Sequence, residues 1–494
     1  MKVFLMYPDR DFDPEQPLPW NDEALIQDLE LEVIFKTMAQ KDPFLYQAAR
    51  TGLLSSLTDP GLIRYRQDIL QDCLRNQDIV REIYRLPIES EEKKRKYWMG
   101  VFSRFPGGIL SSAVEMMKMF MTLLQRLRRI ADARAQQFRS EGFTRFFAMI
   151  RQELDDAFFA EAAGHLKELK FRSGVLLDAK VGPGAEAQRY ILRKPDRSQP
   201  WIKQLFASKL RECSFRLPPR DNTGARILSE IKDQGINQVA NALAQSADHV
   251  DSFFGMLRSE LAFYIGAMNL HEALAGLGQP VVMPAPAPAG QRQHAFAGLY
   301  DISLALTTQQ SVVGNDLDAS GKAMAVITGA NQGGKSTFLR SVGQAQLMMQ
   351  SGLFVPATSF SANVCSGLAT HYRREEDASM TSGKLDEELG RMSAIIDHLG
   401  PDALVLLNES FAATNEREGS EIARQIITAL LEERVKLFFV THLYAFARER
   451  YNRHDKDVIF LRAGRESDGT RTYKIVEGEP LQTSFGQDLY RQIF

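Results

Sequence analysis

Nine consecutive residues constrain this 494-residue chain more than any other stretch. They are Gly329, Ala330, Asn331, Gln332, Gly333, Gly334, Lys335, Ser336 and Thr337. The apolar run 325–328 before them predicts a buried strand, and the pattern from residue 338 onward predicts a helix. A strand, a G-x-x-x-x-G-K-S turn and a helix place backbone N–H groups and a helix N-terminus against phosphate. The stretch therefore predicts a nucleotide-binding site, although a glycine-rich turn used only for packing has the same glycines.

Two side chains in this stretch suit nucleotide chemistry. Lys335 would reach the β- and γ-phosphates of ATP, and the hydroxyl of Ser336 would contact Mg²⁺. ATP and Mg²⁺ are therefore the cofactors that the sequence predicts.

A second apolar run, 403–407, predicts a parallel strand buried on both faces. Asn408 and Glu409 follow it, at the end of the strand that should face the ligand. The amide oxygen of Asn408 can accept from metal-bound water, and Glu409 can act as a general base. The pair could instead cap a helix that begins near Ser410.

A third apolar run, 435–440, predicts another buried strand, and Thr441 and His442 follow it. A histidine at this edge can sense a γ-phosphate by hydrogen bonding. The alternative is a structural histidine, the commoner role for a single one. We expect His442 to belong to the catalytic group with Glu409.

The composition excludes several classes. The formal net charge is −2, so a nucleic-acid partner needs a local basic patch. Cys73, Cys213 and Cys365 are distant from one another, which argues against disulfides and a zinc site. The acidic N-terminus is unlike a signal peptide. The apolar stretch 109–124 is too short to span a bilayer and predicts a buried amphipathic helix. We expect a cytoplasmic protein with no membrane partner.

The region before the glycine-rich stretch is helical with one interruption. Helical periodicity covers residues 22–166 and returns over 221–277. Between them, 173–181 and 187–192 predict two strands around a Gly-Pro-Gly turn, and 215–217 is a possible third.

The interruption is basic. Residues 165–220 hold 13 Lys and Arg against 5 Asp and Glu. The candidates for contacts with DNA phosphates are Lys180, Arg189, Arg193, Lys194 and Arg197. A solvated basic face without a ligand is the alternative.

These motifs together resemble one family. Residues 296–486 resemble the ATPase domain of MutS-type mismatch-repair proteins. The resemblance depends on 328–337 with Arg340, on 352–357, on 407–409 with Thr414, on Thr441 and His442, and on Gly478 with 484–486. The helical region resembles the core and lever domain of the same family less specifically, for example at 63–67.

The resemblance implies a multidomain α + α/β fold in which an ABC-type P-loop ATPase domain follows a helical core and lever domain with a clamp-like insertion. The expected domains are a helical core and first lever arm at 1–166, a basic clamp-like insertion at 167–220, returning lever helices at 221–283, a Pro/Ala linker at 284–295 and the ATPase domain at 296–494. The resemblance also implies a homodimer with composite ATP sites, in which ATP switches a DNA clamp between open and closed states.

The chain departs from the family pattern at four places. One is its end soon after 484–486, where we expect little room for the family's C-terminal dimerising helices. Asn408 stands where an aspartate is usual, which predicts slow hydrolysis. Ser382 and Glu387 are present, but Gly383 and Lys384 replace the Thr and Phe of the trans-acting signature. No mismatch-reading domain is expected before the core, so contacts with duplex or branched DNA should involve the backbone. The rival prediction is an ATP-gated interaction module that acts on a protein or ribonucleoprotein.

Overall fold

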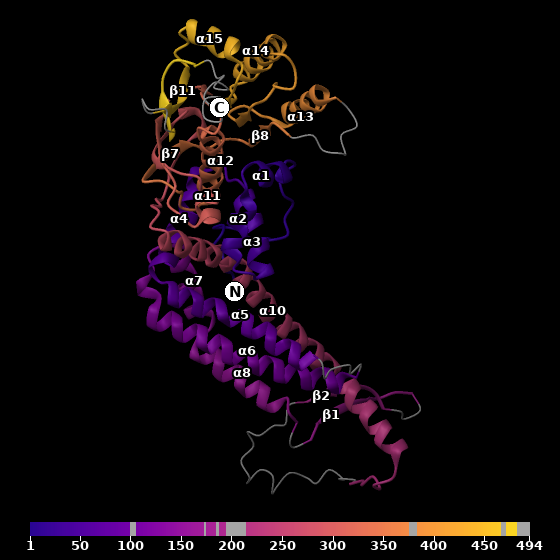
Figure 1. Ribbon diagram of the computed structural model, residues 1–494. Coiled ribbons are helices and arrows are strands. Elements are labelled where there is room, and N and C mark those ends of the chain that lie inside the picture. Colours follow the sequence, from indigo (N-terminus) through magenta and orange to yellow (C-terminus); the bar gives the residue numbers. More distant parts are fainter. Residues whose placement is uncertain are drawn as a thin grey trace. The chain divides into compact units, whose positions relative to one another are not determined.

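The computed structural model describes residues 1–98, 105–171, 174–183, 187–193, 214–374, 383–465 and 471–481 (Figure 1). Its contacts separate the chain into two compact units. The helical unit contains Met1–Val3, Arg81–Gln136 and Thr144–Arg258. The sheet unit contains Phe4–Val80, Gln137–Phe143 and Ser259–Phe494. The fold is mixed helical and α/β, as the sequence predicted.

The first part of the chain is helical. In chain order its helices are α1 (Asp22–Asp28), α2 (Leu31–Ala39), α3 (Pro43–Leu54), α4 (Pro60–Arg75), α5 (Gln77–Trp98), α6 (Pro106–Arg134), the 3₁₀ turn η1 (Ala135–Gln137), α7 (Glu141–Glu153), α8 (Asp156–Glu168) and α10 (Asn222–Gly276). Two Asp-Pro pairs start helices. Asp42 accepts a hydrogen bond from the N–H of Phe44 at 2.8 Å, and Asp59 accepts one from the N–H of Gly61 at 2.7 Å.

The helical periodicity that begins at residue 22 is divided between two helices, α1 and α2. The chain breaks at Glu30, which has a left-handed φ of 50°. The break frees two carbonyl groups. That of Leu29 accepts a hydrogen bond from Gln344, and that of Glu30 accepts one from Ser303, both at 2.9 Å. Tertiary hydrogen bonds therefore replace the helical ones at this point.

Helix α6 was predicted as an amphipathic helix over 109–124. Among the described residues, only Pro106–Gln137 is long and apolar enough to cross a membrane by length and composition. Its apolar side chains include Phe120, which is fully buried and lies 6.0 Å from the ring of Phe254 in α10. The buried stripe is the one expected of a core helix, and it contributes to the core of the helical unit.

The predicted strand pair is present in the helical unit. β1 (Leu177–Val181) pairs antiparallel with β2 (Ala187–Leu192), with a register shift between Ala179 and Lys180. A Cβ on Gly235 of α10 would lie 2.3 Å from the side chain of Leu177. β1 therefore packs closely on that helix. The possible third strand at 215–217 is wrong, because these residues are irregular and the two prolines after them lack the N–H groups of a ladder.

A six-stranded sheet forms the core of the sheet unit, in the order β12-β11-β6-β10-β9-β8. All neighbours are parallel except β11 and β12. The strands are β6 (Met324–Thr328), β8 (Leu368–Tyr372), β9 (Leu404–Asn408), β10 (Lys436–Val440), β11 (Val458–Arg465) and β12 (Arg471–Glu477). The central strands are buried on both faces, which explains their continuous apolar sequences.

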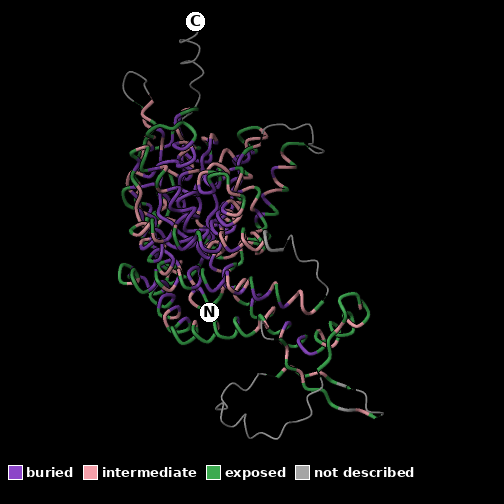
Figure 2. Tube along the Cα trace, turned by 90° about the horizontal axis from the view of Figure 1, so that it is seen from below, coloured by how far each residue is buried: buried purple, intermediate pink, exposed green. Residues whose placement is uncertain are grey.

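Helices cover both faces of this sheet. α13 (Lys384–His398), α14 (Glu416–Glu432) and α15 (Tyr444–Asn452) share one apolar cluster with Val405 and Leu407 of β9. Leu406 points the other way, to α12 (Lys335–Ser351), where a Cβ on Gly343 would meet it at 2.7 Å. The alternation along β9 therefore separates the two helical layers. Buried residues concentrate in this unit (Figure 2).

A second sheet flanks the first, in the order β3-β7-β4-β5. Its strands are β3 (Ala285–Ala287), β4 (His294–Leu299), β5 (Asn315–Asp318) and β7 (Ser359–Asn363), with η2 (Ala289–Gln291) and α11 (Ile302–Thr308) between them. The predicted linker at 284–295 is therefore corrected. Its extended conformation is as expected, but β3 is an edge strand, a position that tolerates proline.

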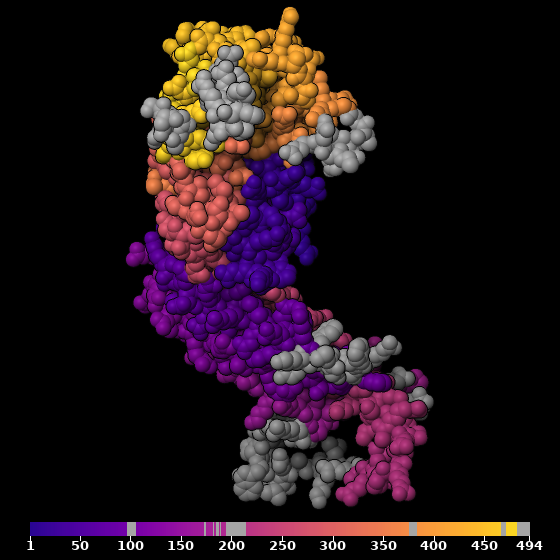
Figure 3. All heavy atoms as spheres, viewed as in Figure 1, coloured from indigo at the N-terminus to yellow at the C-terminus, as the bar shows by residue number. Residues whose placement is uncertain are grey.

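The N-terminal helices belong to the sheet unit. α1–α4 contact the sheet unit through α11, α12, β3 and β8. Figure 3 shows this segment, in indigo, directly against residues near 300, in salmon. The expected domain 1–166 is thus divided between the two units, because residues 4–80 bury their apolar faces on α11 and α12.

Gly352, directly after the C-terminus of α12, packs closely against Arg66. Gly352 has a φ of 85°, and a Cβ there would lie 2.4 Å from the Cβ of Arg66. Arg66 is fully buried, and its guanidinium donates to the carbonyl of Met6 at 2.9 Å. It has little room to move. Gly321 has a similar φ of 74° but open space around it.

We expect Gly321→Ala to lower the free energy of unfolding by about 1–2 kcal/mol, the cost of a left-handed residue with a side chain. Gly352→Ala should cost a further ~1–3 kcal/mol, because the methyl group overlaps Arg66. Urea unfolding of both variants measures the difference. Equal losses would show that Arg66 yields without cost.

Candidate functional site

The 329–334 loop connects β6 to α12 and approaches β11 closely. Gly329 and Gly334 have φ values of 118° and 89°. A Cβ on Gly329 would lie 2.9 Å from the backbone nitrogen of Ala463, and one on Gly333 would lie 2.8 Å from the Cβ of Ala463. Glycine is therefore required at Gly329 by conformation and contact, at Gly334 by conformation and at Gly333 by contact.

Lys335 begins α12, and its side chain folds back over the loop. Its Nζ donates to the carbonyl oxygens of Gly329 and Ala330, both at 2.9 Å. The residue is 5% exposed, and this burial lowers the pKa of its ammonium, while the charge of Glu409 opposes the shift. The ammonium is thus held at the loop by two neutral acceptors, which an anion could replace.

Ser336 and Asn408 meet at the carboxyl end of the sheet. The Oγ of Ser336 donates to the Oδ1 of Asn408 at 3.0 Å. Hydroxyl and amide oxygens are hard donors that fit Mg²⁺, which keeps most of its other ligands as water and phosphate oxygens. The described residues contain no group of three or more His, Cys, Asp or Glu that could hold a metal ion. A metal here would therefore depend on these two oxygens and on a bound phosphate.

Glu409 and His442 are brought together by two neighbouring strands. Glu409 follows β9, His442 follows β10, and the Nε2 of His442 donates to the Oε1 of Glu409 at 2.7 Å. This hydrogen bond is the largest influence on the Glu409 carboxyl and lowers its pKa, with help from the charges of Lys335 and Arg373, while burial opposes it. Glu409 is therefore a carboxylate at neutral pH.

Arg373 was not singled out from the sequence. It follows β8, and its Nη1 lies 3.7 Å from the Oε2 of Glu409. The arginine side chain is 52% exposed, so part of it remains available to a ligand. The sequence offered no clear signal, because β8 ends in Thr370, His371 and Tyr372 and was not predicted as a strand.

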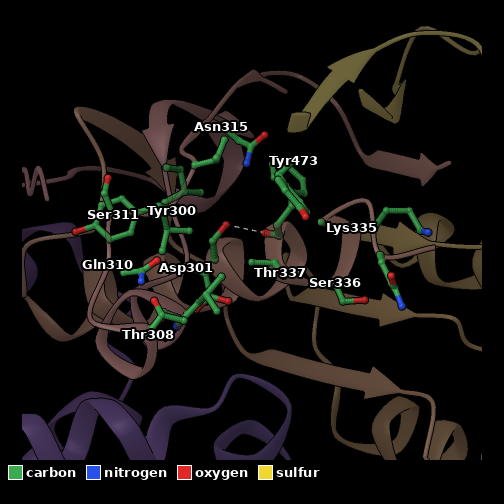
Figure 4. A pocket seen from close by; sticks show the side chains of 18 of the residues that line it. Tyr300, Asp301, Thr308, Gln310, Ser311, Asn315, Lys335, Ser336, Thr337 and Tyr473 are labelled. Atoms are coloured by element: carbon green, nitrogen blue, oxygen red, sulfur yellow. Dashed lines mark hydrogen bonds between the residues drawn. The ribbon is translucent and has the colours of Figure 1, made fainter. Parts of the chain in front are cut away.

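Of these groups, Lys335, Ser336 and Glu409 border a cavity of about 630 Å³ within the sheet unit (Figure 4). One wall consists of loop and helix residues, among them Asn331, Gln332, Lys335, Ser336 and Thr337, with Glu409. The other wall comes from residues between 299 and 315, with Tyr473 of β12. The sequence predicted the first wall and missed the second, because residues 299–315 contain no phosphate-binding pattern.

The predicted DNA-contacting residues lie away from this cavity. Lys180, Arg189 and Arg193 are exposed on or beside the β1–β2 hairpin of the helical unit, and Arg193 pairs with Asp178. Lys194 and Arg197 lie outside the described residues.

The structure describes only part of the altered trans-acting signature at 382–387. Ser382 is outside the described residues, whereas Glu387 lies in the first turn of α13 and pairs with Arg391 at 2.6 Å.

Comparison with known proteins links both units to one family. A family model described as the MutS2 N-terminal domain matches residues 58–277, and one described as MutS domain V matches residues 325–492. The chain belongs to the MutS family. The domain V match includes the 329–334 loop, Asn408, Glu409 and His442, and the MutS2 match includes the β1–β2 hairpin. The family resemblance inferred from the motifs is therefore confirmed.

Individual relatives match over shorter stretches. The DNA mismatch repair protein MutS of Leptospira interrogans is 34% identical over 130 residues, 26% of this chain and 15% of that protein. The DNA mismatch repair protein MutS of Clostridium tetani is 30% identical over 182 residues, 33% of this chain and 21% of that protein. MutS protein homolog 4 of Mus musculus is 28% identical over 145 residues, 29% of this chain and 15% of that protein. The matches thus span 15% to 21% of the length of these relatives.

The Glu409–His442 hydrogen bond gives a pH prediction. The pKa of Glu409 is lowered from its ordinary 4.5, so the interaction stabilises the fold above that pH and is lost as pH falls through the folded value. His442→Ala should raise the pKa of Glu409, because the largest lowering influence is removed. Carboxyl ¹³C NMR titration measures the change. His454→Ala, at an exposed histidine of the same unit, should leave the titration unchanged.

Proposed function

We propose that this protein is a slow ATPase of the MutS type that binds DNA in an ATP-dependent way. The observation that carries the proposal is the meeting of Lys335, Ser336 and Glu409 at one cavity, at the carboxyl end of a parallel sheet. Ligands of open α/β sheets bind at this end. The DNA mismatch repair proteins that match this chain support the DNA part of the proposal.

In the proposed reaction the loop binds the phosphates of ATP. The backbone N–H groups and the N-terminus of α12 face the anion, and the ammonium of Lys335 exchanges its two carbonyl acceptors for β- and γ-phosphate oxygens. Ser336 and Asn408 would hold Mg²⁺, which supplies charge neutralisation to the phosphates when bound. The second cavity wall at 299–315 is available for the nucleoside.

Glu409 is the proposed general base. It is ionised at neutral pH, and its Oε1 is oriented by His442. Asn408 adds no negative charge to the metal site, unlike the usual aspartate, so the site should hold Mg²⁺ more weakly. This is the physical basis for a slow rate.

The β1–β2 hairpin is the proposed DNA-contacting element. Lys180 and Arg189 are exposed on it, and phosphate contacts by such side chains give affinity without base identity. We propose binding to duplex or branched DNA through the backbone, without mismatch reading. A homodimer with composite ATP sites, clamp opening and closing driven by ATP, and a cytoplasmic location complete the proposal.

The ATP site is tested by two substitutions with different outcomes. Lys335→Ala should abolish tight ATP binding, because the charge at the phosphates is lost. Glu409→Gln should bind ATP but cleave it at least ~100-fold more slowly, within the range expected for loss of a general base. Isothermal titration and single-turnover cleavage measure the two effects, and Lys456→Ala, at an exposed lysine, is the control. Normal ATP affinity in the Lys335 variant would refute the assignment.

The DNA surface is tested by Lys180→Gln combined with Arg189→Gln. The dissociation constant for duplex DNA should rise roughly tenfold at low salt, and the slope of log affinity against log salt should fall by about two. Arg85→Gln with Arg129→Gln removes the same charge from exposed positions of α5 and α6 and should change neither value. If the wild-type protein binds ATP but shows no salt-dependent DNA binding, the interaction module is the better description.

A further inference from the structure

The turn after Glu409 has an unusual backbone. Glu409 and Phe411 have φ values of 55° and 64°. Two non-glycine residues in the left-handed region within three positions are costly, and such a turn persists only where its surroundings hold it. The N–H of Glu409 donates to the carbonyl of Val440 at 2.8 Å, which fixes one end of the turn. The groups that hold the rest of the turn come from other elements.

Glu388 of α13 holds the backbone at Phe411. Its carboxylate accepts a hydrogen bond from the N–H of Phe411 at 2.6 Å. Glu388 is 4% exposed, and burial raises the pKa of its carboxyl, while the backbone amides of Phe411 and Ala413 lower it. A buried carboxylate directed at the amides of a strained turn compensates for the conformation of that turn.

His371 of β8 holds Ser410, the residue between the two strained ones. Its Nδ1 lies 2.7 Å from the Oγ of Ser410, and its Nε2 lies 3.1 Å from the carbonyl oxygen of Glu388. A carbonyl only accepts, so Nε2 carries the hydrogen, and the hydroxyl of Ser410 lies between two acceptors of His371, its Nδ1 and its backbone carbonyl oxygen at 2.8 Å. Burial lowers the pKa of His371 to about 4, which keeps the ring neutral at pH 7. The same ring stacks on Phe411, with centroids 5.9 Å apart.

The turn has no room on its other side. A Cβ on Gly419 of α14 would lie 2.4 Å from the carbonyl oxygen of Phe411. The turn is therefore enclosed by β8, α13 and α14. Neither His371 nor Glu388 lines the cavity, so neither has a role in contact with a ligand there.

We infer that Glu388 and His371 are positioning residues that fix the turn at 410–411 and thereby hold Glu409 in place for ATP cleavage. This inference rests on the proposed function, because it concerns the base of that reaction. It predicts a specific pattern. Loss of the hydrogen bonds from Glu388 or His371 displaces Glu409 and slows ATP cleavage, while the phosphate-binding loop still binds ATP. A displacement of about 1 Å can cost on the order of 100-fold in rate.

The test compares two substitutions at one position. Glu388→Met has a similar volume but no acceptor for the N–H of Phe411, and it should slow single-turnover ATP cleavage about 10- to 100-fold. ATP affinity should remain within about twofold, because the loop is unchanged. Glu388→Gln keeps an acceptor oxygen and should remain within roughly threefold of the wild-type rate. A residue needed only for folding would not show this separation of rate from affinity with recovery by glutamine.

A second pair keeps the test decisive if Glu388→Met does not fold. Ser410→Ala removes the hydroxyl held by His371. It should slow cleavage at least about fivefold with ATP affinity unchanged, which is less than the full rate loss that a misplaced base can cause. Ser420→Ala removes another buried hydroxyl, one with no hydrogen-bond partner among the described residues, and should have no effect on the rate.

The outcomes separate the inference from the proposed function. A wild-type protein that does not cleave ATP overturns the proposed function and the inference with it. Wild-type cleavage combined with normal rates in Glu388→Met, or in Ser410→Ala where the methionine variant is unfolded, overturns the inference alone. Equal losses of affinity and rate, or a Gln variant as slow as the Met variant, also overturn it.

Discussion

The in-register parallel pairing of β6, β10 and β9 is the constraint on which the site depends. Ile327 is opposite Val440, which in turn is opposite Asn408. The strands therefore end at one edge, and the segments that follow them emerge side by side. Because the side chains of a strand alternate between its faces, a slip of one residue would move Leu406 from α12 to the opposite helical layer. The two apolar layers thus fix the register of the strands. The register in turn fixes the positions of the polar residues that follow the strands.

The helix that carries Lys335 is held from its other side by the N-terminal segment. Gln344 of α12 donates to the carbonyl of Leu29 and to the hydroxyl of Ser303, both at 2.9 Å. Arg340, one turn earlier, pairs with Asp301 and Glu30. These polar contacts join residues 4–80 to the sheet unit, with which they cluster. They also connect Lys335 to the wall of the cavity that contains Asp301.

Lys335 and Glu409 line the cavity, and Arg373 lies beside Glu409. Lys335 and Arg373 are positive, and Glu409 is the carboxylate that both of them influence. Asn408 is neutral, so these four residues have a net positive charge that suits a phosphate group. In the proposed Mg²⁺ site the amide of Asn408 accepts from Ser336, at the position where the family usually has an acid.

The sequence by itself determined the groups that act within short stretches. The 329–337 loop, Asn408 with Glu409, and His442 were recognisable because each follows a continuous apolar run, and such runs predict buried strands whose ends share one edge. The β1–β2 hairpin was recognisable from its turn residues. Only the tertiary structure decided the rest. Arg373, His371 and Glu388 act through partners 17 to 39 residues away, and no local pattern records such contacts. Residues 285–287 join a sheet because β7 lies beside them, although the local sequence specifies only an extended chain.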